Sequence, residues 1–211
     1  MRLEVKNLEK SFKSEKVLQD INLDFTDGHI YGIIGRNGSG KSVLFKIICG
    51  FMHADGGTVS LDGKIIGKDI DFPENMGAII ENPGFLWYQS GLSNLDYLAG
   101  IRKKVNKAQV KETMRLVGLN PDSKKWVGKY SLGMKQRLSI AQAIMENPDL
   151  IVLDEPMNGL DEQGVGEMRE LFLKLKEEHK LILMASHNRE DIDMLCDEVY
   201  HIEKGKIEKV R

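Results

Sequence analysis

Apolar residues along the chain follow two kinds of strand pattern. Residues 2–6 and 21–25 alternate polar and apolar side chains, which predicts half-exposed antiparallel strands. Short continuous apolar runs instead predict strands that are buried on both faces, as in a parallel sheet. These runs lie at 29–34, 76–80, 150–153 and 181–185. Turns that contain glycine also predict two hairpins, at 58–66 and 198–210.

Helical periodicity is concentrated in the middle of the chain. Residues 94–101 and 108–117 carry it, and Ser131 has the character of an N-cap for a helix that runs to about residue 147. Asn82-Pro83-Gly84 predicts the break between the preceding strand and this helical region. Further helices are expected outside the region, at 43–49, 161–178 and 189–195.

These elements predict an α/β fold in one domain that spans residues 1–211. Strands that alternate with helices favour a three-layer core, formed by 1–81 and 148–211, with an antiparallel β flank. The helical segment at 82–147 is expected to be an insertion into that core.

Composition narrows the class of protein without choosing a function. Hydrophobic residues make up 41% and charged residues 29%, as in ordinary globular domains. The net charge of −2 and the lack of a long basic run argue against nucleic acid as a partner. No apolar run approaches the length of a membrane span, and the N-terminus is too polar for a signal peptide, so we expect a cytoplasmic protein. Cys49 and Cys196 lie far apart in apolar surroundings, which predicts reduced core residues.

Residues 35–42 match the phosphate-loop pattern G-x-x-x-x-G-K-[ST], and a predicted strand and helix flank them. Glycine lets the backbone approach a phosphate closely, and the N–H groups at a helix N-terminus bind the anion. Lys41 is expected on the β- and γ-phosphates of a nucleotide, and Ser42 on Mg²⁺. A chance match is the alternative, and the flanking elements argue against it. The predicted nucleotide-binding residues here are Gly35, Arg36, Asn37, Gly38, Ser39, Gly40, Lys41, Ser42 and Val43.

Two acids end the apolar run at 150–153. Asp154 is expected to hold Mg²⁺, as the Walker-B aspartate does in phosphate-loop enzymes. Glu155 is then expected near the γ-phosphate of ATP, where it can orient or deprotonate the attacking water. An exposed acidic strand end is the alternative, and the phosphate loop favours the functional interpretation.

The order of these motifs resembles the ATP-binding subunits of ABC transporters over essentially the whole chain. Tyr130-Ser131-Leu132-Gly133-Met134 resembles the L-S-G-G-Q signature of that family, and residues 158–161 resemble its S-G-L-D loop. The resemblance implies an ATPase that uses ATP and Mg²⁺. It also implies a membrane permease on a separate chain, with the ATP-binding subunit on the inner face of the cell membrane.

The signature gives a physical reason for dimerisation. Ser131 and the N–H groups of Gly133 and Met134 would form a second anion site at a helix N-terminus, which one chain cannot easily bring to its own phosphate loop. In the family, two subunits pack head to tail and sandwich two ATP molecules between these sites. The sequence leaves open whether the second subunit is a like chain or a different one. Ser131 would also serve as a plain helix cap.

Several positions depart from the family pattern. Leu132 replaces a signature glycine and Met134 replaces the glutamine, so the contact across a dimer is expected to be weaker. Val43 follows Ser42 where a second hydroxyl is usual. Glu81 stands where the family has a glutamine that couples metal, water and the helical lobe, so we expect it to be a metal ligand that adds a negative charge.

Two further residues match positions of the family. His187 follows the strand predicted at 181–185, where the family has a histidine that senses the γ-phosphate, and we assign it to catalysis with Glu155. Phe12 lies where an aromatic residue stacks on adenine. The alternatives are a histidine satisfied at a strand end and a phenylalanine that packs in the core.

The surroundings of Glu81 resemble the group that exports peptide antibiotics such as bacitracin and lantibiotics, or protects against them. The sequence therefore predicts an ATPase subunit that powers export of a drug or peptide antibiotic, with ATP and Mg²⁺ as ligands and with no nucleic-acid partner. Trp87 and Tyr88 are expected either in the core or in an apolar patch for the permease. The rival functions are an ABC-type ATPase that acts on ribosomes or DNA, a small-molecule kinase, and a regulatory module without turnover.

Overall fold

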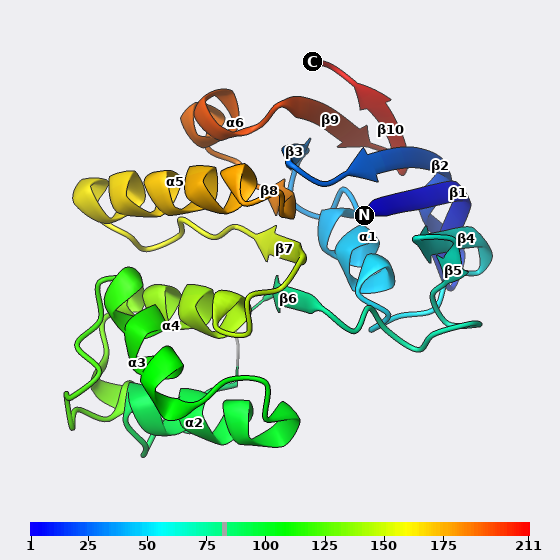
Figure 1. Cartoon of the computed structure of the whole chain (residues 1–211). Coiled ribbons are helices and arrows are strands. Elements are labelled where there is room, and N and C mark those ends of the chain that lie inside the picture. The colour runs from blue at the N-terminus through cyan, green and yellow to red at the C-terminus, as the bar shows by residue number, and fades with distance from the viewer. Residues whose placement is uncertain (82–83) are drawn as a thin grey trace.

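The computed structural model describes residues 1–81 and 84–211, and its strands form two sheets (Figure 1). The antiparallel sheet has the order β2-β1-β4-β5, and the second sheet has the order β10-β9-β3-β8-β7-β6. The strands are β1 (Arg2–Phe12), β2 (Glu15–Thr26), β3 (His29–Ile34), β4 (Gly56–Leu61), β5 (Lys64–Ile65), β6 (Met76–Ile79), β7 (Leu150–Asp154), β8 (Leu181–Ala185), β9 (Glu198–Glu203) and β10 (Lys206–Lys209).

The helices fall into two groups along the chain. Those of the first group pack near the sheets and are α1 (Lys41–Ile48), α5 (Glu162–Glu177) and α6 (Arg189–Leu195). Figure 1 shows the others gathered below the β6–β7 edge, namely α2 (Gly91–Arg102), α3 (Lys107–Leu116) and α4 (Leu132–Ile144), with a short 3₁₀ turn at Val127–Lys129. These three helices lie where the sequence predicts the insertion. Residues 82 and 83, at which the sequence predicts a break, lie outside the described residues.

The central strands face two separate cores, which explains their continuous apolar runs. Ile151 and Leu153 pack into the core that includes α4 and α5, whereas Leu150 and Val152 pack into the core that includes α1 and the antiparallel sheet. Successive side chains of a strand point to opposite faces, so a strand between two cores is apolar at every position. Strands β3, β8, β7 and β6 run parallel, and their carboxyl ends meet at one edge of the sheet.

The first two strands are longer than the alternation predicts. They pair from Arg2 with Thr26 to Phe12 with Glu15, and the register shifts around Leu8, where β-bulges interrupt the alternation. Pairing with a neighbouring strand therefore extends β1 and β2 beyond the segments in which the side-chain pattern is regular. The prediction of antiparallel strands is confirmed, and their predicted lengths are wrong.

Other expectations have clear outcomes. Trp87 is 65% and Tyr88 47% exposed, so the core alternative for this pair is wrong.

Cys49 and Cys196 are free and buried, as predicted, and burial raises the pKa of each thiol to about 12. Among the described residues, none of the helices combines the length and apolar character that crossing a bilayer requires.

Gly77 in β6 permits the close approach of α4 to the parallel sheet. A Cβ atom at this position would lie 1.8 Å from the backbone carbonyl oxygen of Ala143. A backbone atom of a packed helix cannot yield as a flexible side chain can, so α4 would have to move away from β6. This glycine therefore sets the spacing between the sheet and the helical region.

We expect Gly77→Ala to lower the free energy of unfolding by about 2 kcal/mol or more, because overpacking forces the backbone apart. Urea denaturation should show a lower midpoint with an unchanged slope. Gly166→Ala is the matched control: it lies in α5 with nothing within 4 Å of the added Cβ, and should stabilise by about 0.5–1 kcal/mol. Equal midpoints for the two variants would contradict this account of the sheet–helix contact.

Candidate nucleotide-binding site

The phosphate loop connects the carboxyl end of β3 to the N-terminus of α1. Gly40 is the N-cap of α1 with φ of 107°, a value that favours glycine, and a Cβ there would lie 3.0 Å from the carbonyl oxygen of Val17. A Cβ on Gly35 would lie 2.4 Å from the carbonyl oxygen of Ile202. The two glycines thus allow the loop to curl tightly between β2 and β9, which leaves the first N–H groups of α1 available to an anion.

Lys41 is buried at the first position of α1 and folds back over the loop. Its Nζ donates hydrogen bonds to the carbonyl oxygens of Gly35, at 2.8 Å, and Arg36, at 3.1 Å. A cation is thereby held at the centre of the phosphate loop. Phosphate oxygens are strong acceptors for such an ammonium group, so the loop fits a polyphosphate.

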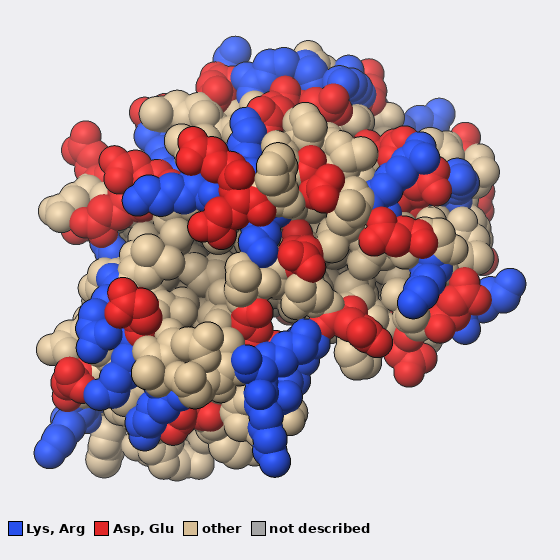
Figure 2. Space-filling view, viewed as in Figure 1, with Lys and Arg blue, Asp and Glu red and all other residues tan. Residues whose placement is uncertain are grey.

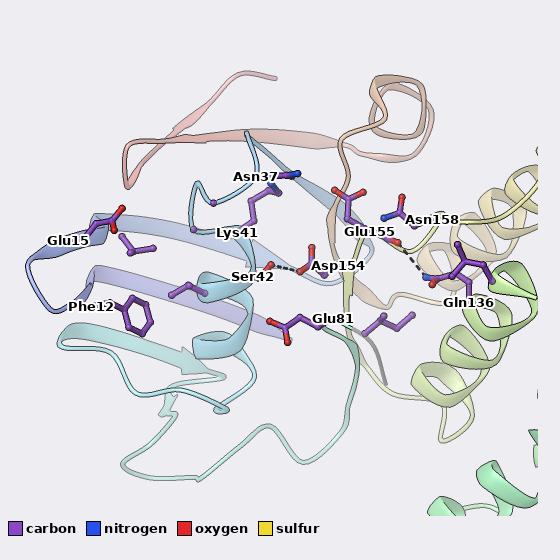
Figure 3. Close-up of a pocket in the computed structure, with 16 residues that line it drawn as sticks. Phe12, Glu15, Asn37, Lys41, Ser42, Glu81, Gln136, Asp154, Glu155 and Asn158 are labelled. Carbon is purple, nitrogen blue, oxygen red and sulfur yellow. Dashed lines mark hydrogen bonds between the residues drawn. The ribbon is translucent and has the colours of Figure 1, made fainter. Parts of the chain in front are cut away.

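Ser42 and Asp154 come together although they are far apart in the sequence. The Ser42 hydroxyl donates to the Asp154 carboxylate at 2.5 Å, and Asp154 is the last residue of β7 (Figure 3). One hydroxyl and one carboxylate are oxygen ligands of the kind that Mg²⁺ prefers, with water and phosphate oxygens completing its shell. The described residues contain no cluster of three or more His, Cys, Asp or Glu suited to a metal.

Glu81, the third predicted metal ligand, lines the same cavity as Ser42 and Asp154. Its carboxylate, however, accepts a hydrogen bond from Nζ of Lys46 at 2.5 Å. Glu81 therefore lies near the predicted metal position but is engaged by a lysine that the sequence analysis did not single out.

Glu155 and His187 form a second polar pair at the same edge of the sheet. The N–H of Glu155 donates to the carbonyl oxygen of Ala185 at 2.9 Å, which holds this residue beside β8. Its Oε2 then lies 2.7 Å from Nδ1 of His187 and accepts from the backbone N–H of His187 at 3.3 Å. The carboxylate is less exposed than the imidazole, at 22% against 66%. The two predicted catalytic residues are thus in direct contact.

A cavity of about 850 Å³ joins the phosphate loop, the Ser42–Asp154 pair and Glu155, whereas His187 lines a separate hollow beside Gly35 and Arg36. The cavity extends from the Lys41 loop to Phe12 of β1, whose side chain is 43% exposed and faces the open space in Figure 3. A site of this volume accommodates a ligand of nucleotide size. The remaining lining residues are Glu15, Val17, Asn37, Gly38, Gly40, Ser42, Val43, Ile79, Glu81, Leu132, Gln136, Asp154, Glu155 and Asn158.

Some predicted residues lie elsewhere. Arg36 and Ser39 line a hollow on the other side of the phosphate loop, and Ser39 Oγ is buried with no hydrogen-bond partner among the described residues. Ser131 is the N-cap of α4, as predicted, and its hydroxyl accepts from the N–H of Met134 at 3.2 Å. Ser131, Gly133 and Met134 lie outside the lining of this chain's own cavity, which Leu132 reaches from the same turn.

Several residues near the site were not among the predicted site residues. Gln136 of α4 donates to the carbonyl oxygen of Pro156 at 2.9 Å, which joins the helical region to the acidic strand end. Glu15 and Val17 follow Phe12 across a tight turn, so the hairpin itself was the available signal. The spacing of Lys46 was the available signal, because a residue four positions after Ser42 lies on the same face of the helix.

The fold and the site together define a phosphate-loop nucleotide-binding protein in which two acids follow the central strand β7 beside the loop. The family model described as "ABC transporter" matches residues 18–158, about two thirds of the chain. The chain belongs to the ABC transporter family, and it is an ATPase of the ABC type. The resemblance stated from the sequence motifs is confirmed.

Curated relatives align with almost the whole chain. An uncharacterized ABC transporter ATP-binding protein of Bacillus subtilis, YybJ, is 40% identical over 98% of this chain and 94% of its own length. The bacitracin transport ATP-binding protein BcrA of Enterococcus faecalis is 39% identical over 97% of this chain and 67% of its own. The lantibiotic transport ATP-binding protein SrtF of Streptococcus pyogenes is 34% identical over 97% and 88%.

Solved structures share the fold. A nucleotide-free ATP-binding cassette from an ABC transporter superposes with a TM-score of 0.86 at 25% identity, over 100% of this chain and 92% of that chain. The dimeric bacterial ABC transporter cassette MJ0796 superposes with a TM-score of 0.88 at 23% identity, over 99% of each chain. The α/β fold with an antiparallel flank and a helical region, expected from the sequence, is confirmed.

We expect Lys41→Ala to weaken ATP binding by about 100-fold, because the charge-assisted hydrogen bonds to phosphate are lost. Titration with a fluorescent ATP analogue measures the effect. Lys64→Ala removes an exposed lysine of β5 and should change the affinity by less than about two-fold, since surface charges contribute little. Near-normal affinity of Lys41→Ala would exclude the phosphate-loop assignment.

Proposed function

We propose that the protein binds and hydrolyses Mg·ATP as one half of a dimer, and that this cycle drives a separate membrane permease that exports a drug or peptide antibiotic. One observation carries the proposal most directly. The phosphate loop, the Ser42–Asp154 pair and the Glu155–His187 pair occupy one edge of the parallel sheet. An edge of this kind is where nucleotides bind in open α/β folds.

Each group has a task that its geometry supports. Lys41 binds the β- and γ-phosphates, while Ser42 and Asp154 hold Mg²⁺, which neutralises phosphate charge when bound. Glu155 orients or deprotonates the attacking water, since its carboxylate lies beside the end of β7. His187 orients Glu155 through the Nδ1 contact and contacts the γ-phosphate. Phe12 stacks on the adenine ring at the far end of the cavity.

Dimerisation completes the site in this proposal. The N-terminus of α4, at Ser131, Gly133 and Met134, lies outside the lining of the chain's own cavity, and Leu132 beside it is 65% exposed. In a head-to-tail dimer, this turn of one subunit faces the phosphate loop of the other, and the γ-phosphate then bridges two chains. Release of phosphate removes the bridging charge and opens the dimer.

The helical region carries this motion toward the permease. We assign residues 82–147 to a lobe that moves against the core at 1–81 and 148–211, and the Gln136–Pro156 hydrogen bond links the two parts. Trp87 and Tyr88 are exposed in this lobe and stack edge to face, with ring centroids 5.4 Å apart. Exposed aromatic side chains of this kind are favoured at protein interfaces, so we place the contact with the permease here.

The direction and cargo of transport rest on the relatives. BcrA and SrtF are named for transport of bacitracin and of a lantibiotic, and this chain shares 34–39% identity with them. On the face in Figure 2, basic and acidic side chains are interspersed, unlike the continuous basic surface typical of nucleic-acid binding. We therefore favour a transporter subunit that lies peripherally on the inner face of the cell membrane.

Glu155→Gln should reduce steady-state ATP hydrolysis by about 10²- to 10⁴-fold, the usual contribution of a general base, with nucleotide binding retained. Phosphate release and ATP titration measure the two properties separately. Glu162→Gln changes a nearby exposed acid at the start of α5 and should leave both nearly unchanged. Unchanged hydrolysis by Glu155→Gln would refute the assigned role.

Glu155→Gln should also trap the closed dimer, which allows the permease to be captured from gently solubilised native membranes with Mg·ATP. Mass spectrometry should find a multi-span membrane protein. Adding Trp87→Ala should reduce its recovery by about ten-fold or more, as loss of an aromatic interface anchor does. Met194→Ala, a similarly exposed apolar side chain on α6, is the control. Ribosomal or DNA-bound partners in place of a membrane protein would overturn the transporter proposal.

A further inference from the structure

Lys46 and Glu81 form an ion pair beside the predicted metal position. The Lys46 Nζ atom lies 2.5 Å from Glu81 Oε1. Lys46 is in the last turn of α1, and Glu81 is two residues beyond the end of β6 with φ of 61°. A glutamate in the left-handed region is uncommon, and here the turn directs its side chain back toward α1 (Figure 3).

The pair lies one helical turn from the Ser42–Asp154 hydrogen bond. Ser42 and Lys46 are four residues apart on α1, and residues at this spacing are neighbours on one face of a helix. Glu81, Ser42 and Asp154 all line the same cavity. The carboxylate of Glu81 can therefore pair with either of two cations on one side of α1. These are the ammonium group of Lys46 and a metal ion held by Ser42 and Asp154.

The local charges allow Lys46 and a divalent cation to compete for the Glu81 carboxylate. Glu81 adds a negative charge beside a cavity that takes a polyphosphate, and Lys46 compensates it. The side chains are 66% exposed at Glu81 and 29% at Lys46, so solvent weakens their attraction and the pair can separate readily. A divalent cation at closer range would attract the carboxylate more strongly than one ammonium group.

We propose that Lys46 is a positioning residue for the ATPase reaction, which holds the Glu81 carboxylate beside α1 until Mg·nucleotide binds and Glu81 moves to the metal position. This inference rests on the proposed Mg²⁺ site at Ser42 and Asp154. It adds a role for the lysine and a reason for a carboxylate at position 81. Residue 81 precedes the segment that leads to α2, so the exchange also changes how that segment is tied to α1.

The proposed movement of Glu81 from Lys46 to the metal position predicts how Lys46 affects the improvement of nucleotide binding by Mg²⁺. We define the magnesium ratio as the dissociation constant of a non-hydrolysable ATP analogue in EDTA divided by that in Mg²⁺. Lys46→Met removes both the compensating charge and the competitor. Binding should therefore weaken in EDTA and strengthen in Mg²⁺, and the ratio should rise by about five-fold, the upper end for an exposed ion pair. Lys46→Arg keeps the charge and should change the ratio by less than two-fold.

A double-mutant cycle separates this role from a structural one. In a Glu81→Gln background, Lys46→Met should change the magnesium ratio by less than about two-fold, because no carboxylate remains to be held. Thermal unfolding checks that each variant is folded, and Lys46→Gln replaces Lys46→Met if the latter is not. The same five-fold rise in both backgrounds, or no rise in either, would overturn the role of Lys46.

The wild-type protein separates failure of this inference from failure of the proposed function. If Mg²⁺ improves binding to the wild type but Lys46→Met leaves the magnesium ratio unchanged, the proposed Mg²⁺ site is supported and the proposed role of Lys46 is wrong. If the analogue fails to bind the wild type, or binds equally in EDTA and Mg²⁺, the proposed Mg²⁺ site and the proposed role of Lys46 are both wrong.

Discussion

The parallel pairing of β3, β8 and β7 is the constraint on which the rest of the structure depends. It brings three strand ends to one edge of the sheet: the phosphate loop after Ile34, Asp154 with Glu155, and His187 after Ala185. Each polar group there is positioned by a strand buried between two cores, so its place is fixed by backbone hydrogen bonds and close packing. A site that must discriminate phosphate geometry needs such rigid support.

The polar groups at this edge are paired with one another or with the backbone. Lys41 is held by loop carbonyls, Ser42 donates to Asp154, and Glu155 contacts His187. Groups that would otherwise lose hydration without compensation are thereby satisfied within the protein. These side chains are preorganised in this sense, because their hydrogen bonds already fix their positions.

Helix α4 attaches the helical region to the sheet, because its buried side chains share one core with those of β6 and β7. Gly77 lets α4 approach β6 closely, and Gln136 donates to the backbone at Pro156. The packing of α4 on β6 and the hydrogen bonds that Gln136 donates to the carbonyl oxygens of Glu155 and Pro156 attach the helical region near the acidic strand end. The exposed aromatic pair, Trp87 and Tyr88, lies in the same region.

The sequence by itself determined the parts of this protein that depend on local chemistry. The glycine pattern with Lys41 and Ser42, the apolar runs of the central strands and the Ser131 cap were all predictable, because backbone freedom, burial on two faces and capping are encoded by neighbouring residues. Tertiary structure decided the lengths of β1 and β2, the exposure of Trp87, and the partners of Glu81 and Gln136. These features arise from contacts between segments distant in the chain, and no local pattern specifies which segments will meet.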